Sequence, residues 1–95
     1  MVVGTGLLIL RIHDCRSLKE KRKVVKSMVS RLRNHFNASV SEVGANDVYH
    51  RAEIGFSVVG NDHQMINAKI DKIFNMAEDL RLAEVVDTQY EIVHI

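Results

Sequence analysis

Apolar residues recur along the chain with two different periods, and the change of period marks the elements. From Val2 to His13 they alternate, with apolar residues on both faces over the first half, which predicts a strand. From Leu18 to Phe36 they recur at steps of three and four residues, which predicts an amphipathic helix. The stripe consists of Leu18, Val25, Met28, Val29, Leu32 and Phe36.

The start of this helix is marked by the residues "SLKE". The Ser17 hydroxyl is expected to accept the backbone N–H three residues on, while the Glu20 carboxylate reaches back to the Ser17 N–H. This capping box predicts that the helix begins immediately after Ser17.

The second half of the chain repeats the change of period. Alternation over Ala38–Val43 and Arg51–Val59 predicts a hairpin joined by a loop. Either Asn61 or Asp62 is expected to cap a second helix, and Val85–Val93 reads as a final strand. The second helix is expected to bury Ile66, Ile70, Ile73, Phe74, Ala77 and Leu80.

The resulting order, βαββαβ, predicts an α+β fold of the ferredoxin-like type. It is a four-stranded antiparallel sheet with two helices on one face and the first and third strands in the centre. The other face is left uncovered, and Leu7, Ile9 and Val59 fall on it. Because an isolated protein should not expose such a patch, we expect a homodimer that pairs through these residues.

The composition agrees with a single domain over residues 1–95, with 46% hydrophobic and 26% charged residues. No apolar run reaches the roughly 18 residues that span a membrane. The one cysteine, Cys15, has no intramolecular partner for a disulfide, which is typical of a reducing compartment. We therefore expect a cytoplasmic protein.

Charge is distributed unevenly. Residues 1–36 hold nine basic and two acidic residues, a net +7, whereas residues 37–95 hold four basic and ten acidic residues, a net −6. Eight of the thirteen Lys and Arg residues lie between Cys15 and Phe36. Such asymmetry attracts a polyanion, or an acidic protein, to one face of the molecule.

The basic helix is the candidate site for nucleic acid, because lysine and arginine neutralise phosphates without reading sequence. The candidates are Arg16, Lys19, Lys23, Lys26 and Arg33. Two other interpretations stay open: a solvated helix face, and a surface that docks an acidic partner protein. The central strands offer no exposed aromatic residue for base stacking, so any RNA is expected to lie on the helix or a loop.

Arg22 borders the apolar stripe, four residues after Leu18, and needs a partner for its charge. Glu53 or Glu42 on the sheet could form a structural ion pair with it, a role that we favour over a catalytic one.

Other candidate chemistry is sparse. The loop from His13 to Ser17 could hold an anion at the helix start, but it lacks the glycine-bearing loop and the water-orienting asparagine of small phosphatases of this fold. Cys15 could act as a nucleophile with His13 as its base, but a lone cysteine near the end of a strand is most often a small apolar filler. No two of the five histidines have the four-residue spacing of a helical metal site. We therefore expect no enzyme, no catalytic residue, no metal, no cofactor and no small-molecule substrate.

Three segments carry a family resemblance: "SLKEKR" at Ser17–Arg22, "RLRNHFN" at Arg31–Asn37 and "GND" at Gly60–Asp62. With them, nearly the whole chain resembles the YlxP-like family, small bacterial proteins classified as a domain of unknown function. The resemblance implies the ferredoxin-like fold. Family genes often lie near those for ribosome maturation and translation initiation factors, which implies an RNA- or ribosome-associated role. Asp14-Cys15 replaces the proline-containing turn that members often have.

Overall fold

The computed structural model describes all 95 residues and contains four strands and two helices. Their order, βαββαβ, is the one that the periodicity predicts. The elements are β1 (Val2–Arg11), α1 (Leu18–Phe36), β2 (Ser39–Gly44), β3 (Arg51–Gly60), α2 (His63–Asp79) and β4 (Glu84–His94).

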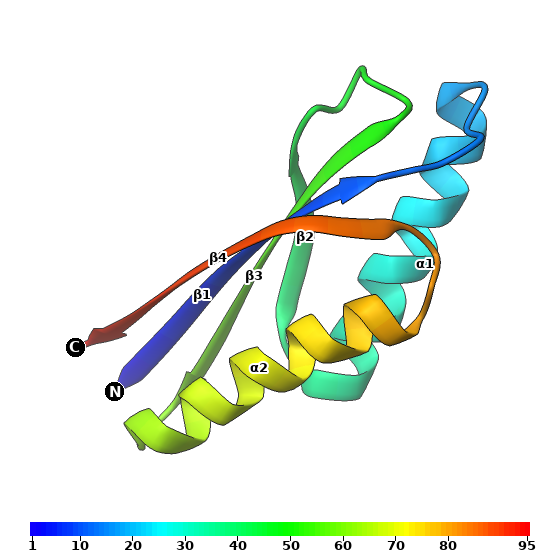
Figure 1. The fold of residues 1–95 in the computed structure, drawn as a ribbon. Coiled ribbons are helices and arrows are strands. Elements are labelled where there is room, and N and C mark those ends of the chain that lie inside the picture. The colour runs from blue at the N-terminus through cyan, green and yellow to red at the C-terminus, as the bar shows by residue number, and fades with distance from the viewer.

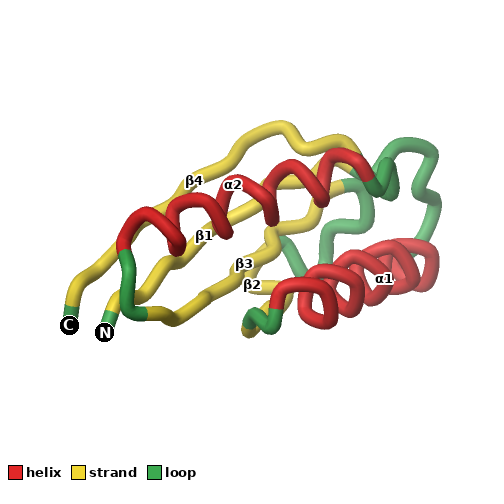
Figure 2. Tube along the Cα trace, turned by 90° about the horizontal axis from the view of Figure 1, so that it is seen from below, coloured by secondary structure: helices red, strands yellow, loops and turns green.

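The strands form one antiparallel sheet in the order β2-β3-β1-β4, with β1 and β3 in the centre. Both helices cover the same face of this sheet, α1 against β2 and α2 against β1 and β4 (Figures 1 and 2). The ferredoxin-like prediction is confirmed. Neither helix is long and apolar enough to span a membrane.

The core lies between the sheet and the helices. Alternate residues of β3, from Ala52 to Val58, point into it and are buried, as their period of two predicts. Glycines in β1 make room for this packing: a Cβ at Gly6 would overlap the Phe56 ring, and one at Gly4 would overlap Ile66 of α2. The two helices contribute Val25, Met28, Leu32, Ile66, Ile70, Ile73 and Ala77.

Both helix starts are capped by side chains. The Ser17 hydroxyl accepts from the Glu20 N–H at 3.2 Å, and Asp62 Oδ2 accepts from the Met65 N–H at 3.0 Å. The Glu20 carboxylate reaches back to the N–H of Arg16, at 2.7 Å, rather than to that of Ser17. The capping box is therefore present, but its returning bond lies one residue earlier than the sequence predicts.

The face of the sheet opposite the helices, here called the open face, differs in one respect from the prediction. Val59 is 62% exposed and Leu7 is partly exposed, but Ile9 is only 7% exposed. Ile9 lies between its cross-strand neighbours Glu53 and Asp87 and is already buried within the single chain. Ile9 is therefore not part of the exposed apolar area, although it lies on the open face.

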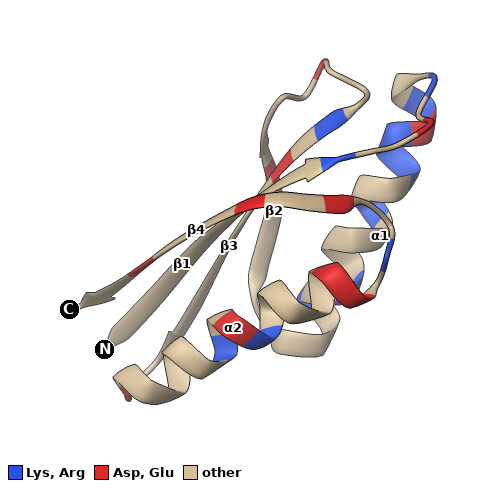
Figure 3. Ribbon diagram, in the orientation of Figure 1, with Lys and Arg blue, Asp and Glu red and all other residues tan.

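The two ends of the molecule are different. The β2–β3 connection, the β1–α1 loop and the start of α1 lie at one end, and the chain termini and the start of α2 lie at the other (Figure 1). Most of the charged residues of α1, those between Lys19 and Lys26, lie at the end that carries the two loops (Figure 3).

Candidate nucleic-acid interface

One cation of α1 is buried, and it is Lys21 rather than Arg22. The Lys21 side chain is 2% exposed, and its Nζ lies 3.0 Å from Oε2 of Glu42. Arg22 is exposed and forms no ion pair, while Glu53 pairs with Arg51 at 3.4 Å. The predicted pair of Arg22 and Glu53 is therefore wrong.

The spacing of the buried residues explains this correction. Lys21 precedes Val25 by four residues and Met28 by seven, so it occupies a position of the buried stripe. Arg22 lies one residue, or roughly 100° of helical rotation, further round and reaches solvent. The spacing of the apolar stripe includes position 21, but a lysine at that position does not by itself indicate burial.

Lys21 holds the β2–β3 connection against the first turns of α1. Its ammonium donates to the carbonyl oxygens of Ala45, at 2.5 Å, and Val48, at 2.7 Å, in addition to its contact with Glu42. The buried Oε2 of Glu42 makes no hydrogen bond, so the ammonium of Lys21 is the only group that compensates its negative charge. This lysine is structural and is not available to a ligand.

Four other cations of α1 form what we call the basic strip: Lys19, Arg22, Lys23 and Lys26. Their spacing places them on one face of the helix, pointing away from the core. All four are exposed, and the three ion pairs of the protein involve none of them. Figure 3 shows Lys and Arg concentrated on the half of α1 nearest the loops.

The basic strip works against the stability of its own helix. Like charges three or four residues apart on a helix destabilise it by about 0.2–0.5 kcal/mol per pair. Lys19 also lies in the first turn, where the helix dipole disfavours a positive charge. The one acid in this part of α1, Glu20, is engaged by the backbone of Arg16. The stability of α1 therefore does not explain why these four cations are clustered on one face.

Two further candidates lie outside the strip. Arg16 is exposed in the loop before α1. Arg33 lies near the other end of the helix, where its Nη2 donates to the Val40 carbonyl oxygen at 3.0 Å and ties α1 to β2. Arg33 thus has a structural partner, whereas Arg22, which the sequence assigned to an ion pair, joins the exposed cations.

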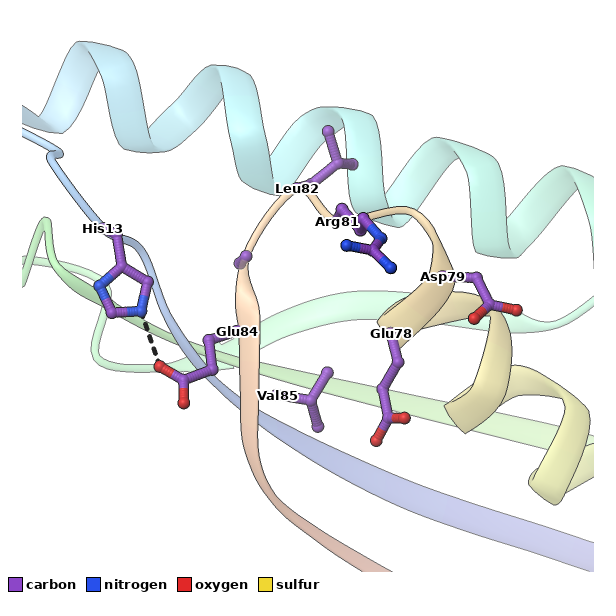
Figure 4. Close-up of a pocket in the computed structure, with 8 residues that line it drawn as sticks. His13, Glu78, Asp79, Arg81, Leu82, Glu84 and Val85 are labelled. Atoms are coloured by element: carbon purple, nitrogen blue, oxygen red, sulfur yellow. Dashed lines mark hydrogen bonds and ion pairs between the residues drawn. The ribbon is translucent and has the colours of Figure 1, made fainter.

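A second cluster of charged groups lies around an open hollow of about 610 Å³ between the end of α2 and the start of β4 (Figure 4). His13 Nε2 lies 2.6 Å from Oε1 of Glu84, and both side chains are exposed. The carboxylates of Glu78 and Asp79 point away from this pair (Figure 4). No three side chains of the metal-binding types come together in the protein.

Cys15 and His13 do not form a nucleophile and base. The Cys15 thiol is partly buried and donates to the carbonyl oxygen of Ser17 at 3.4 Å, while the imidazole of His13 is engaged by Glu84. A catalytic thiolate needs a base within hydrogen-bonding reach. The loop before α1 therefore shows no assembled catalytic group.

Comparison with known sequences gives a family and a relative. Residues 3–90 match the family model described as "Protein of unknown function (DUF503)". The chain is 31% identical over 80 residues to the uncharacterized protein YlxP of Bacillus subtilis (strain 168), covering 84% of this chain and 87% of that protein.

Comparison with solved structures supports the fold alone. The structural-genomics protein YJCS superposes with a TM-score of 0.60 at 12% identity, covering 97% of this chain and 99% of that one. SnoaB, a cofactor-independent oxygenase from Streptomyces nogalater, superposes with a TM-score of 0.53 at 10% identity, covering 100% and 94%. Such low identity carries no activity from one protein to another.

Proposed function

The chain belongs to the YlxP-like family of proteins of unknown function, DUF503, and on that premise we propose that it is a non-enzymatic domain that binds RNA through the basic strip of α1. Free RNA and RNA exposed on a ribosomal particle both present the same phosphate backbone to such a surface. The proposal places the protein in the cytoplasm, where its single thiol, Cys15, stays reduced.

One observation carries the proposal: four exposed cations share one helix face without a single ion pair, at a cost to helix stability. Lysine binds phosphate as a point charge and releases counterions from the nucleic acid. Such contacts give affinity without sequence readout, so binding to RNA of many sequences is expected.

The test compares two variants that change the net charge equally. Lys19, Lys23 and Lys26 on α1 are replaced by Glu in the first variant. The control variant carries Lys69→Glu, Lys72→Glu and Arg81→Glu, on α2 and the turn after it. Filter binding at low salt measures the retention of total RNA and of ribosomal subunits. We expect the α1 variant to lose at least about 100-fold in affinity, and the control to stay within a few-fold of the wild type.

The same strip would also suit an acidic partner protein, and the experiment separates the two. A wild-type protein that retains neither RNA nor ribosomal subunits at low salt would overturn the RNA proposal. Capture of an acidic protein from ribonuclease-treated lysate, lost in the α1 variant, would then support the partner interpretation.

We also propose that two copies pair through the open face. Val59 and Val93, register neighbours of Val3 on either side, are 62% and 40% exposed, and Leu7 is partly exposed in the same face. Light scattering at micromolar concentration is expected to show a dimer, and Val59→Glu a monomer. A wild-type protein that is already monomeric would contradict this proposal.

A further inference from the structure

The connection between β2 and β3 is a loop with a well-fixed backbone. Lys21 binds the carbonyl oxygens of Ala45 and Val48, and the Val48 N–H donates back to the Ala45 oxygen at 3.0 Å. At its other end the Ile12 N–H donates to the His50 carbonyl oxygen at 2.9 Å. The loop is thereby held between β1 and the first turns of α1.

This fixed loop presents two rings to solvent. Tyr49 is 43% exposed, and its hydroxyl makes no hydrogen bond within the protein. His50 is also exposed, and the two ring centroids lie 5.9 Å apart with an interplanar angle of 86°. An aromatic ring that the core does not use, on a fixed backbone, is suited to stack on a ligand ring.

Cations lie on the elements that adjoin this loop. The basic strip shares the first turns of α1 with Lys21, which binds Val48, the residue before Tyr49. His50 lines an open hollow of about 340 Å³ with Arg11 and Arg51.

The two arginines of this hollow are direct cross-strand partners on β1 and β3, an arrangement that costs stability unless an anion neutralises it. Arg51 contacts Glu53, whereas Arg11 makes no ion pair. Asp14 and Asp47, exposed in the two loops, repel phosphate. We therefore expect phosphates along the basic strip and at Arg11 rather than at the tip of the β2–β3 loop.

We propose that Tyr49 and His50 form a base-stacking site for single-stranded RNA, with the flanking phosphates held by the basic strip and Arg11. This inference rests on the proposed function and narrows its ligand. Unpaired bases offer their faces to aromatic side chains, whereas the bases of an A-form duplex stay stacked inside it. The site compensates for the missing aromatic residues on the central strands of the sheet.

The experiment measures the affinity of the whole protein for a labelled oligouridine and for an RNA duplex of the same length, by fluorescence anisotropy. Tyr49→Ala is expected to weaken oligouridine binding about ten- to a hundred-fold while leaving duplex binding nearly unchanged. Tyr49→Phe should bind like the wild type, because it keeps the ring. Tyr90→Ala, which removes the more exposed tyrosine of β4, 59% exposed against 43% for Tyr49, is the control.

A spectroscopic readout accompanies the affinity. The chain has two tyrosines and no tryptophan, so in a Tyr90→Phe background the tyrosine fluorescence reports Tyr49 alone. Quenching on addition of oligouridine is the expected result.

The outcomes distinguish failure of the stacking site from failure of RNA binding by the basic strip. Unchanged oligouridine affinity in Tyr49→Ala, together with loss in the α1 variant with three Lys→Glu changes, would overturn the stacking site and leave RNA binding intact. Wild-type binding to the duplex alone would also overturn the stacking site. Failure of the wild type to bind either RNA would overturn both.

Discussion

The two helices lie on the same face of the sheet and are built alike on their inner sides. Each begins at a side-chain cap, Ser17 or Asp62, and each packs a stripe of large apolar residues against the strands. On their outer sides they differ. Besides Lys21, α1 carries Lys19, Arg22, Lys23, Lys26, Arg31 and Arg33 with one acid, Glu20, whereas α2 carries Lys69 and Lys72 with Asp71, Glu78 and Asp79.

This difference shows that packing does not determine the charge of an outer face. The outer face of α2 carries nearly equal numbers of basic and acidic residues, and α2 packs against the same sheet. The excess of cations on α1 therefore needs another explanation, and phosphate binding supplies one.

The inner sides also differ at one position. The buried residues of α2 are all apolar, whereas those of α1 include Lys21 with its partner Glu42. A buried ion pair is seldom the most stable filling of a core position. Here the lysine also binds the loop that carries Tyr49, so it connects the core of the protein to the proposed stacking site.

The largest effect is expected at this buried pair. Lys21→Met should reduce the free energy of unfolding by about 3–5 kcal/mol, because it leaves the Glu42 carboxylate buried without a partner. Urea denaturation measures the loss, and Lys19→Met, on the exposed side of the same turn, should stay within about 0.5 kcal/mol of the wild type.

A second variant keeps the explanation for this loss testable. Adding Glu42→Leu to Lys21→Met removes the unpaired carboxylate, so the double variant should be more stable than the single one. A double variant as unstable as the single one would show that the loop contacts, not the carboxylate, account for the loss.

The helix caps should give an intermediate effect. Ser17→Ala and Asp62→Ala each remove an acceptor for an otherwise unpaired N–H, at a cost of about 0.5–2 kcal/mol. The loss at Asp62 should be the larger, because its charge also interacts favourably with the helix dipole. Denaturation midpoints of the two variants make the comparison, and an unchanged midpoint would mean that the helix in question does not depend on its cap.

The smallest effect concerns the strip itself. Lys23→Gln should raise the free energy of unfolding by a few tenths of a kcal/mol, because it removes like-charge neighbours on α1. The matched change on α2, Lys72→Gln, should raise it less, because only one like charge, Lys69, lies three or four residues from Lys72, against Lys19 and Lys26 for Lys23. Thermal denaturation at low salt measures both, and a clear loss of stability in Lys23→Gln would mean that the strip serves folding.

Most of the fold follows from local patterns that the chain itself displays. Alternation in β3 identified each of its buried residues, and polar residues before the two stripes identified the Ser17 cap and narrowed the second cap to Asn61 or Asp62. These features depend on residues within a few positions of each other, which is why the sequence alone was sufficient for them.

The missed features depend on contacts between distant parts of the chain. Lys21 is buried because Glu42 and two loop carbonyls, more than twenty residues away, satisfy its ammonium. Ile9 is buried in the sheet between residues of two other strands, Glu53 and Asp87. The role proposed for Tyr49 depends on the position of its loop beside α1, which the contacts of Lys21 with Ala45 and Val48 fix.

The salt dependence of RNA binding tests the central claim, that the basic strip of α1 neutralises phosphates, most directly. If all four strip cations contact the backbone of a single strand, the plot of log affinity against log salt should have a slope of about −3, at about −0.7 per phosphate. The variant with Glu at positions 19, 23 and 26 should lose most of that slope, while the control variant on α2 and the following turn should keep it. A wild-type slope near zero, or the same slope in both variants, would contradict the account.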